Sequence, residues 1–140
     1  MTNPQARQLS NLLRKITIGE QHLVTEQSKT LGVTEQQART LGVINAHPGI
    51  IQRELADRFN RRGASISNML KNLEHDGYVE RRRSPQNDRN KQLFLTAKGK
   101  ALVAAVNQIF DTTEAALIKD LTPAEVQTLI TTLQKIHLPD

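Results

Sequence analysis

The 140-residue chain has no cysteine and no tryptophan, and it contains only three phenylalanines and one tyrosine. The absence of cysteine excludes a disulfide framework, a thiolate metal site, a cysteine nucleophile and a thiol redox sensor. Few aromatic rings argue against single-strand nucleic-acid binding, which stacks bases on such rings. No apolar run approaches the roughly 20 residues that span a bilayer, and residues 1–10 lack a signal-peptide core. We therefore expect a soluble, cytoplasmic protein that does not bind membranes.

Residues suited to catalysis or metal binding are present, but they show none of the spacings typical of a catalytic or metal site. The four histidines, His22, His47, His75 and His137, form no metal-ligand spacing such as HExxH. No glycine-rich phosphate loop follows a predicted strand, and Ser65 and Ser67 lack the nearby His/Asp signature of a nucleophile. We expect no enzymatic activity, no metal and no cofactor.

Positive charge is concentrated in the middle of the chain. Residues 58–100 contain 11 basic and 4 acidic residues, whereas residues 1–57 carry a net +1 and residues 101–140 a net −3. A basic block between neutral and acidic segments favours a polyanionic partner over a merely solvated surface.

Apolar periodicity and capping signals predict six helices, in a length that suits one domain. Capping boxes are expected at Thr34 with Gln37 and at Thr122 with Glu125, and Thr96 is expected to cap the fifth helix. The first four helices are predicted at about residues 5–30, 34–46, 51–59 and 64–75, and the second ends at His47-Pro48-Gly49. The fifth is predicted from residue 97 to the break at residues 120–123, and the sixth from residue 123 through Ile136. The third and fourth are short and follow one another closely, which is the helix-turn-helix pattern.

A change of periodicity after Gly77 predicts a β-hairpin between the fourth and fifth helices. Its strands are expected at Tyr78–Arg83 and Gln92–Leu95, joined by a polar tip at residues 84–91 that is longer than usual. The predicted fold class is therefore mainly α with a small β-hairpin (α+β).

The fourth helix is expected to read base edges in a DNA major groove. Its apolar face carries Ile66, Met69, Leu70 and Leu73, and its outward face carries Ser, Asn and Lys, which pair with bases or phosphates. The arginines of the hairpin are expected to contact phosphates, with Arg89 entering a minor groove. The predicted DNA-binding residues are Arg62, Ser65, Ser67, Asn68, Lys71, Arg81, Arg83, Arg89 and Lys91.

Continuous apolar stripes on the first, fifth and sixth helices exceed what a small core needs. They favour association of two copies, which would space two reading helices by about 34 Å. The alternative is that these helices pack on the helix-turn-helix of their own chain. The predicted interface residues are Leu9, Leu12, Leu13, Ile16, Leu117, Leu121, Leu129, Leu133 and Ile136.

Three stretches together resemble the MarR family of winged helix-turn-helix transcriptional regulators. They are Gly63–Glu74, Gly77–Arg81, and Leu93–Gly99, which looks like the family's "L-x-L-T-x-x-G". The family's wing carries Asp-x-Arg, and here Asn87-Asp88-Arg89 replaces that aspartate with Asn87. The resemblance implies one MarR-type domain over residues 1–140, with a DNA-binding lobe at about 34–96 and dimerisation helices at about 5–30 and 97–138.

The resemblance also implies a function. It suggests a homodimeric repressor on a pseudo-palindromic double-stranded DNA operator, with the fourth helix in the major groove. Many members release DNA when a small aromatic or phenolic compound binds between the dimerisation helices and the DNA-binding lobe, so either such an effector or none is expected here, at unknown residues. The competing interpretation is a winged-helix module for protein or RNA interaction that reads no operator.

Overall fold

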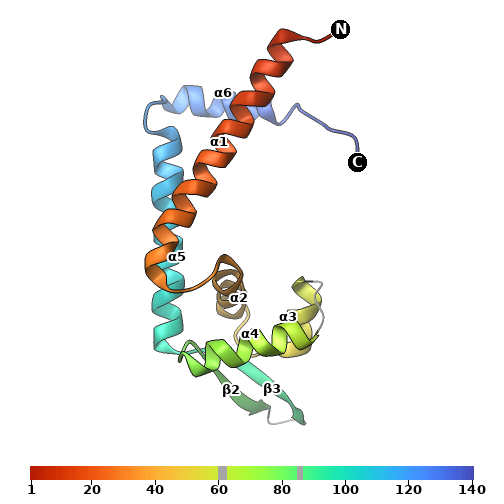
Figure 1. Cartoon of the computed structure of the whole chain (residues 1–140), viewed down its shortest axis with the longest axis vertical. Coiled ribbons are helices and arrows are strands. Elements are labelled where there is room, and N and C mark those ends of the chain that lie inside the picture. The colour runs from red at the N-terminus through yellow and green to blue at the C-terminus, as the bar shows by residue number, and fades with distance from the viewer. Residues whose placement is uncertain (60–62, 85–86) are drawn as a thin grey trace. The chain divides into compact units, whose positions relative to one another are not determined.

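The computed structural model describes residues 1–59, 63–84 and 87–140, without the side chains of residues 63, 64 and 87–89. Helices dominate these residues, and strands β2 and β3 lie side by side as a hairpin after α4 (Figure 1). The helices are α1 (Pro4–Ser28), α2 (Glu35–Ala46), α3 (Gln52–Phe59), α4 (Gly63–His75), α5 (Ala97–Ile118) and α6 (Pro123–Leu133), with a short 3₁₀ helix at Lys29–Leu31; the strands are β1 (Ile50–Ile51), β2 (Val79–Ser84) and β3 (Asn87–Leu95).

The chain divides into two compact units. The first combines Met1–Val24 with Phe110–Asp140, and the second, which we call the central unit, is Thr25–Ile109. The expected lobe at residues 34–96 falls within the central unit. Helices α1 and α5 each contribute residues to both units.

Helix starts follow the local signals in the sequence. Thr34 and Gln37 form the predicted capping box, with the backbone N–H of Gln37 donating to Thr34 Oγ1 at 3.1 Å. Thr122 and Glu125 repeat this arrangement at α6. The bonds that Thr122 donates from its backbone and side chain hold the pKa of the Glu125 carboxyl below its usual range.

The sheet contains a strand that the sequence did not predict. Ile50 and Ile51 form β1, which pairs antiparallel with β3 through the Ile50–Leu93 and Ile51–Gln92 registers. The i, i+4 spacing of Ile51 and Leu55 favoured a helix from residue 51, but pairing with β3 holds Ile51 in the sheet. In the described residues the strand order is β1-β3-β2.

The hairpin tip is shorter than predicted. The expected eight-residue tip at residues 84–91 is wrong, because β2 extends to Ser84 and β3 starts at Asn87. Between Arg83 and Ser84 the partner on β3 changes from Lys91 to Asn87, so residues 88–90 fall within a register shift. Turn-forming residues are accommodated in this strand because the register shift relaxes the regular pairing.

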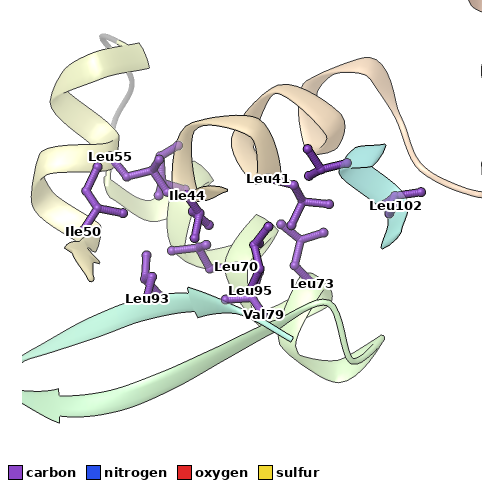
Figure 2. Packing of buried hydrophobic residues seen from close by; sticks show 12 residues of the cluster. Leu41, Ile44, Ile50, Leu55, Leu70, Leu73, Val79, Leu93, Leu95 and Leu102 are labelled. Atoms are coloured by element: carbon purple, nitrogen blue, oxygen red, sulfur yellow. The ribbon is translucent and has the colours of Figure 1, made fainter. Parts of the chain in front are cut away.

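The core of the central unit lies between α2, α4 and the sheet. Figure 2 shows Leu41 and Ile44 of α2 facing Leu70 and Leu73 of α4, with side chains of the sheet on the other side. Each α4 residue named here is fully buried, as the apolar face predicted. The buried cluster is completed by Ile50, Leu55, Ile66, Val79, Leu93, Leu95, Leu102 and Val103. This packing fixes which face of α4 is left for solvent.

A tight junction joins the end of α4 to the start of α5. Gly77 has φ +82°, which favours glycine, and its carbonyl oxygen accepts a bond from Thr96 Oγ1 at 2.6 Å. Thr96 also caps α5 as predicted, because its Oγ1 accepts the Gly99 N–H at 3.1 Å. The backbone N–H of Thr96 donates to the Tyr78 carbonyl at 3.1 Å, so the two helices and the hairpin are anchored at one point.

Two ends of the terminal helices differ from prediction. Helix α1 stops at Ser28 and continues as the 3₁₀ helix Lys29–Leu31 up to Gly32, whose φ is +72°. Helix α6 ends at Leu133, so Ile136 lies beyond the helix in which it was predicted. No described helix combines the length and the apolar character needed to cross a membrane.

Candidate nucleic-acid interface

Helix α4 presents a polar face opposite its buried apolar face. Ser65, Asn68 and Lys71 are exposed, and Ser67 is half-buried. Asn68 and Lys71 are three residues apart and therefore lie on one side of the helix. The structure thus brings together the four predicted α4 residues on an accessible surface of short hydrogen-bonding groups and one cation.

One face of the hairpin changes from apolar to cationic along its length. Side chains alternate between faces of a strand, so Val79, Arg81 and Arg83 share a face. Val79 pairs with Leu95 and is buried in the core, whereas Arg83 pairs with Lys91 and both are exposed. We call Arg81, Arg83 and Lys91 the cationic face of the hairpin. Like charges directly opposite each other repel, so this face favours a bound anion.

The polar face of α4 and the cationic face of the hairpin meet in a groove. It has a volume of about 440 Å³. Its lining residues are Ser67, Lys71, Glu74, Val79, Glu80, Arg81 and Lys91. Predicted residues from α4, β2 and β3 therefore border one depression in the central unit.

A second groove contains a cation that the sequence analysis missed. Arg53 of α3 lines this groove, of about 240 Å³, together with Arg81 and Lys91. Arg53 lies in a short helix just before the basic block, and its proximity depends on β1 holding the start of α3 beside β3. The remaining lining residues are Ile51, Gln52 and Asn90.

The arginines of β2 have different surroundings. Arg81 forms an ion pair with Glu74 of α4 and donates from Nη1 to Gln52 Oε1 at 3.1 Å. Arg82, on the opposite face, pairs with Glu80 and lies over the Phe94 ring, 4.3 Å from its centroid. The sequence suggested neither acidic partner of these arginines.

The side chains of two predicted DNA-binding residues, Arg62 and Arg89, lie outside the described set. Arg62 lies outside the described residues. Arg89 belongs to β3 by its backbone, but its side chain, like those of Asn87 and Asp88, is outside the described set. The effect of Asn87 on the wing arginine therefore stays a prediction.

The apolar stripes of the terminal helices are uncovered in the single chain. Helices α1 and α6, both fully described, contain no buried residue. Leu121 is half-buried, and the other predicted interface residues are between 36% and 49% exposed. These residues are Leu9, Leu12, Leu13, Ile16, Leu117, Leu129, Leu133 and Ile136.

Comparison with known proteins identifies the family. Residues 31–89 match the model of the MarR family. A protein of Clostridium acetobutylicum assigned to the MarR family of transcriptional regulators is 39% identical, with a TM-score of 0.81, over 91% of this chain and 94% of that one. The chain belongs to the MarR family. The winged helix-turn-helix fold predicted from the sequence is thereby confirmed.

This MarR-family chain is also similar to MepR and to HosA. The S. aureus MepR–DNA complex contains a chain that is 32% identical, with a TM-score of 0.82, over 90% of this chain and 95% of MepR. The transcriptional regulator HosA of Escherichia coli O111:H- is 26% identical over 117 residues, which are 84% of this chain and 87% of HosA.

The residues that match the MarR model include most of the predicted interface. The matched range begins just before α2 and ends within β3, so every predicted DNA-binding residue except Lys91 lies inside it. In the part of the chain that the structure describes, no three His, Asp or Glu residues gather as metal ligands would. All lining residues of the larger groove except Lys91 lie within the range that matches the MarR model.

Proposed function

We propose that the protein is a sequence-specific, double-stranded DNA-binding transcriptional regulator that acts as a homodimer. The observation that supports this most is the groove where Ser67 and Lys71 of α4 meet Lys91 of the hairpin. A helix fits the B-DNA major groove, and cations beside it suit the adjacent phosphates. The relative MepR has been crystallised as a DNA complex, which makes the same ligand the first candidate for this chain.

The apolar stripes of α1, α5 and α6, which are exposed in the single chain, support the proposed dimer. A second copy would remove these side chains from water, and a two-fold arrangement would present two copies of α4 to one duplex. We further propose that the dimer represses transcription and that a small organic effector releases it. A compound that prefers a different separation of the two copies of α4 would weaken DNA binding by its difference in affinity.

Selection from a pool of random-sequence duplexes tests the function. We expect enrichment of a motif with two inverted half-sites, about one helical turn apart from centre to centre. A structured RNA hairpin, offered as competitor, is expected to displace the selected duplex poorly. Lack of enrichment, or equal binding of the RNA, would instead favour a module for RNA or protein interaction.

Asn68→Ala is expected to weaken binding to the selected duplex by about 1–3 kcal/mol and to leave binding to a shuffled duplex nearly unchanged. The reason is that an exposed Asn on α4 can form a bidentate pair with adenine, which contributes only at the right sequence. Fluorescence anisotropy with both duplexes measures the two affinities. Asn45→Ala, the same change at an exposed position of α2, is the control. If Asn68→Ala lost equal affinity for both duplexes, Asn68 would contact phosphate and would not read a base.

Arg89→Ala is expected to weaken binding on both duplexes and to reduce the slope of log affinity against log salt by about 1. One cation placed against the duplex, here Arg89 in the minor groove, accounts for a change of that size, because it releases condensed counterions. Titrations at several salt concentrations give the slope. Arg7→Ala removes the same charge from exposed α1 and is expected to keep the wild-type slope. An unchanged slope for Arg89→Ala would contradict the assignment of Arg89 to the interface.

A further inference from the structure

Arg81 lies where three elements of the central unit meet. It belongs to β2, and its Nε forms an ion pair with Glu74 Oε1 of α4. Its Nη1 donates to Gln52 Oε1 of α3 at 3.1 Å. The side chains of Arg81 and Glu74 are only 24% and 30% exposed, so solvent screens this pair less than it screens a surface ion pair.

The contacts use the geometry that distinguishes arginine from lysine. A guanidinium is planar and presents several N–H donors in fixed directions, so bonds from Nε and Nη1 fix both its position and its plane. The bond to Glu74 ties the hairpin to the last turn of α4, and the bond to Gln52 ties it to the first turn of α3. Arg83 and Lys91, on the same hairpin face, are exposed by contrast.

Arg81 also neutralises the negative charge of Glu74 in the groove. It lines the same groove as Lys71 and Lys91, where a phosphate would approach. An unpaired carboxylate there would repel phosphate, and the guanidinium of Arg81 neutralises it. Arg81 therefore contributes to this surface through Glu74, with much of its own charge already paired.

We propose that Arg81 is a positioning residue that holds α4 and the hairpin in the relative orientation needed to read DNA, and that it does not bind phosphate. This inference rests on the proposed DNA-binding function, and it revises the expectation that Arg81 contacts DNA directly. The same role makes Glu74 part of the interface, although its carboxylate is negatively charged like the DNA phosphates. Arg81 and Glu74 act as one unit in holding α4, so removing either residue loses the same hold as removing both.

The variants Arg81→Ala, Arg81→Lys, Glu74→Ala and the double Arg81→Ala/Glu74→Ala test the proposal. The probes are the wild-type-selected duplex and its shuffled counterpart, each titrated over a range of salt. For both single alanine variants we expect the ratio of selected to shuffled affinity to fall about tenfold, and for the double variant no further. The double variant keeps the wild-type salt slope, because the ion pair that it removes has no net charge, and Arg81→Lys fails to restore the ratio because one ammonium cannot span both acceptors.

A direct phosphate contact predicts the opposite pattern. Arg81→Ala would then weaken both duplexes equally, the double variant would lower the salt slope by about 1, and Arg81→Lys would restore binding. Any of these results would overturn the positioning role. Lys91→Ala, which removes a neighbouring exposed cation of the same groove, shows what a phosphate contact does in the same assay.

A separate measurement distinguishes failure of the proposed DNA-binding function from failure of the Arg81 proposal. Wild-type protein that shows no preference for any duplex would reject DNA reading, and with it the assigned purpose of the contact. Amide hydrogen exchange without DNA then tests whether the contacts of Arg81 with Glu74 and Gln52 stabilise α4. Faster exchange along α4 in both Arg81→Ala and Arg81→Lys supports the hold on α4, whereas wild-type exchange in both would overturn it.

Discussion

Gly99→Ala is expected to lower the free energy of unfolding by about 3 kcal/mol, which for a chain of this length corresponds to a fall in Tm of roughly 10 °C. A Cβ built on Gly99 would clash with the carbonyl oxygen of Tyr78, and it would also lie 3.3 Å from the Cβ of Leu95. Neither neighbour is the end of a flexible side chain. The start of α5 would have to move away from the hairpin.

The bonds of the junction make that movement unfavourable. Tyr78 accepts the backbone N–H of Thr96, and the Thr96 hydroxyl donates to Gly77 at 2.6 Å. Shifting α5 stretches both bonds, so the strain spreads into the turn that ends α4. Because this turn also starts β2, we expect the variant to lose DNA binding together with stability.

Thermal and urea unfolding at one protein concentration measure the effect of Gly99→Ala. Gly42→Ala is the matched control, because nothing lies within 4 Å of a Cβ at this position inside α2. Alanine is the better helix former, so the control is expected to raise stability by about 0.5–1 kcal/mol. A stability of Gly99→Ala within 0.5 kcal/mol of wild type, about the size of an ordinary surface effect, would contradict the close contact with Tyr78.

Leu129→Glu is expected to raise the dimer dissociation constant about a thousandfold. Leu129 is exposed in the single chain, on the same side of α6 as Leu133, and we propose that a second copy covers both. An unpaired carboxylate buried in an apolar interface costs about 2 kcal/mol or more, and a two-fold interface contains two of them. A monomer presents only one copy of α4, so affinity for a two-half-site duplex falls with the dimer.

Sedimentation over a range of protein concentrations gives the dimer dissociation constant, and anisotropy gives the DNA affinity. Gln127→Glu adds the same charge on the polar side of α6, where Gln127 donates to Thr131 Oγ1 at 3.2 Å, and it is expected to remain dimeric. Leu129→Glu that dimerises like wild type would show that this stripe is not the interface. Dissociation of both variants would point to net charge rather than to burial of Leu129.

Local signals account for what the sequence predicted correctly. Thr34 and Thr122 cap helices through bonds to residues three positions later, so the relevant partners are visible in a short window. The buried and polar faces of α4 follow from a period of 3.6 residues, which is also local. Gly77 was likewise recognisable, because few other residues adopt its positive φ.

Features that depend on distant partners were missed. Strand β1 exists because Ile50 and Ile51 pair with residues more than forty positions away, and two residues carry no strand periodicity of their own. The early start of β3 has a different cause: Asn87 pairs with Ser84 of β2, only three positions away, and the turn preference of this stretch did not indicate a strand. Arg81 counted only as one of several cations, since the chain gives no indication that Glu74 and Gln52 face it.

The most direct test of the account compares one duplex with its shuffled version. Wild-type protein is titrated against the selected duplex and a shuffled duplex of the same composition, at about 150 mM salt, where non-specific attraction is screened. Reading by α4 predicts at least about a thousandfold tighter binding to the selected duplex. Equal affinity for the two duplexes would mean that the polar face of α4 does not read sequence.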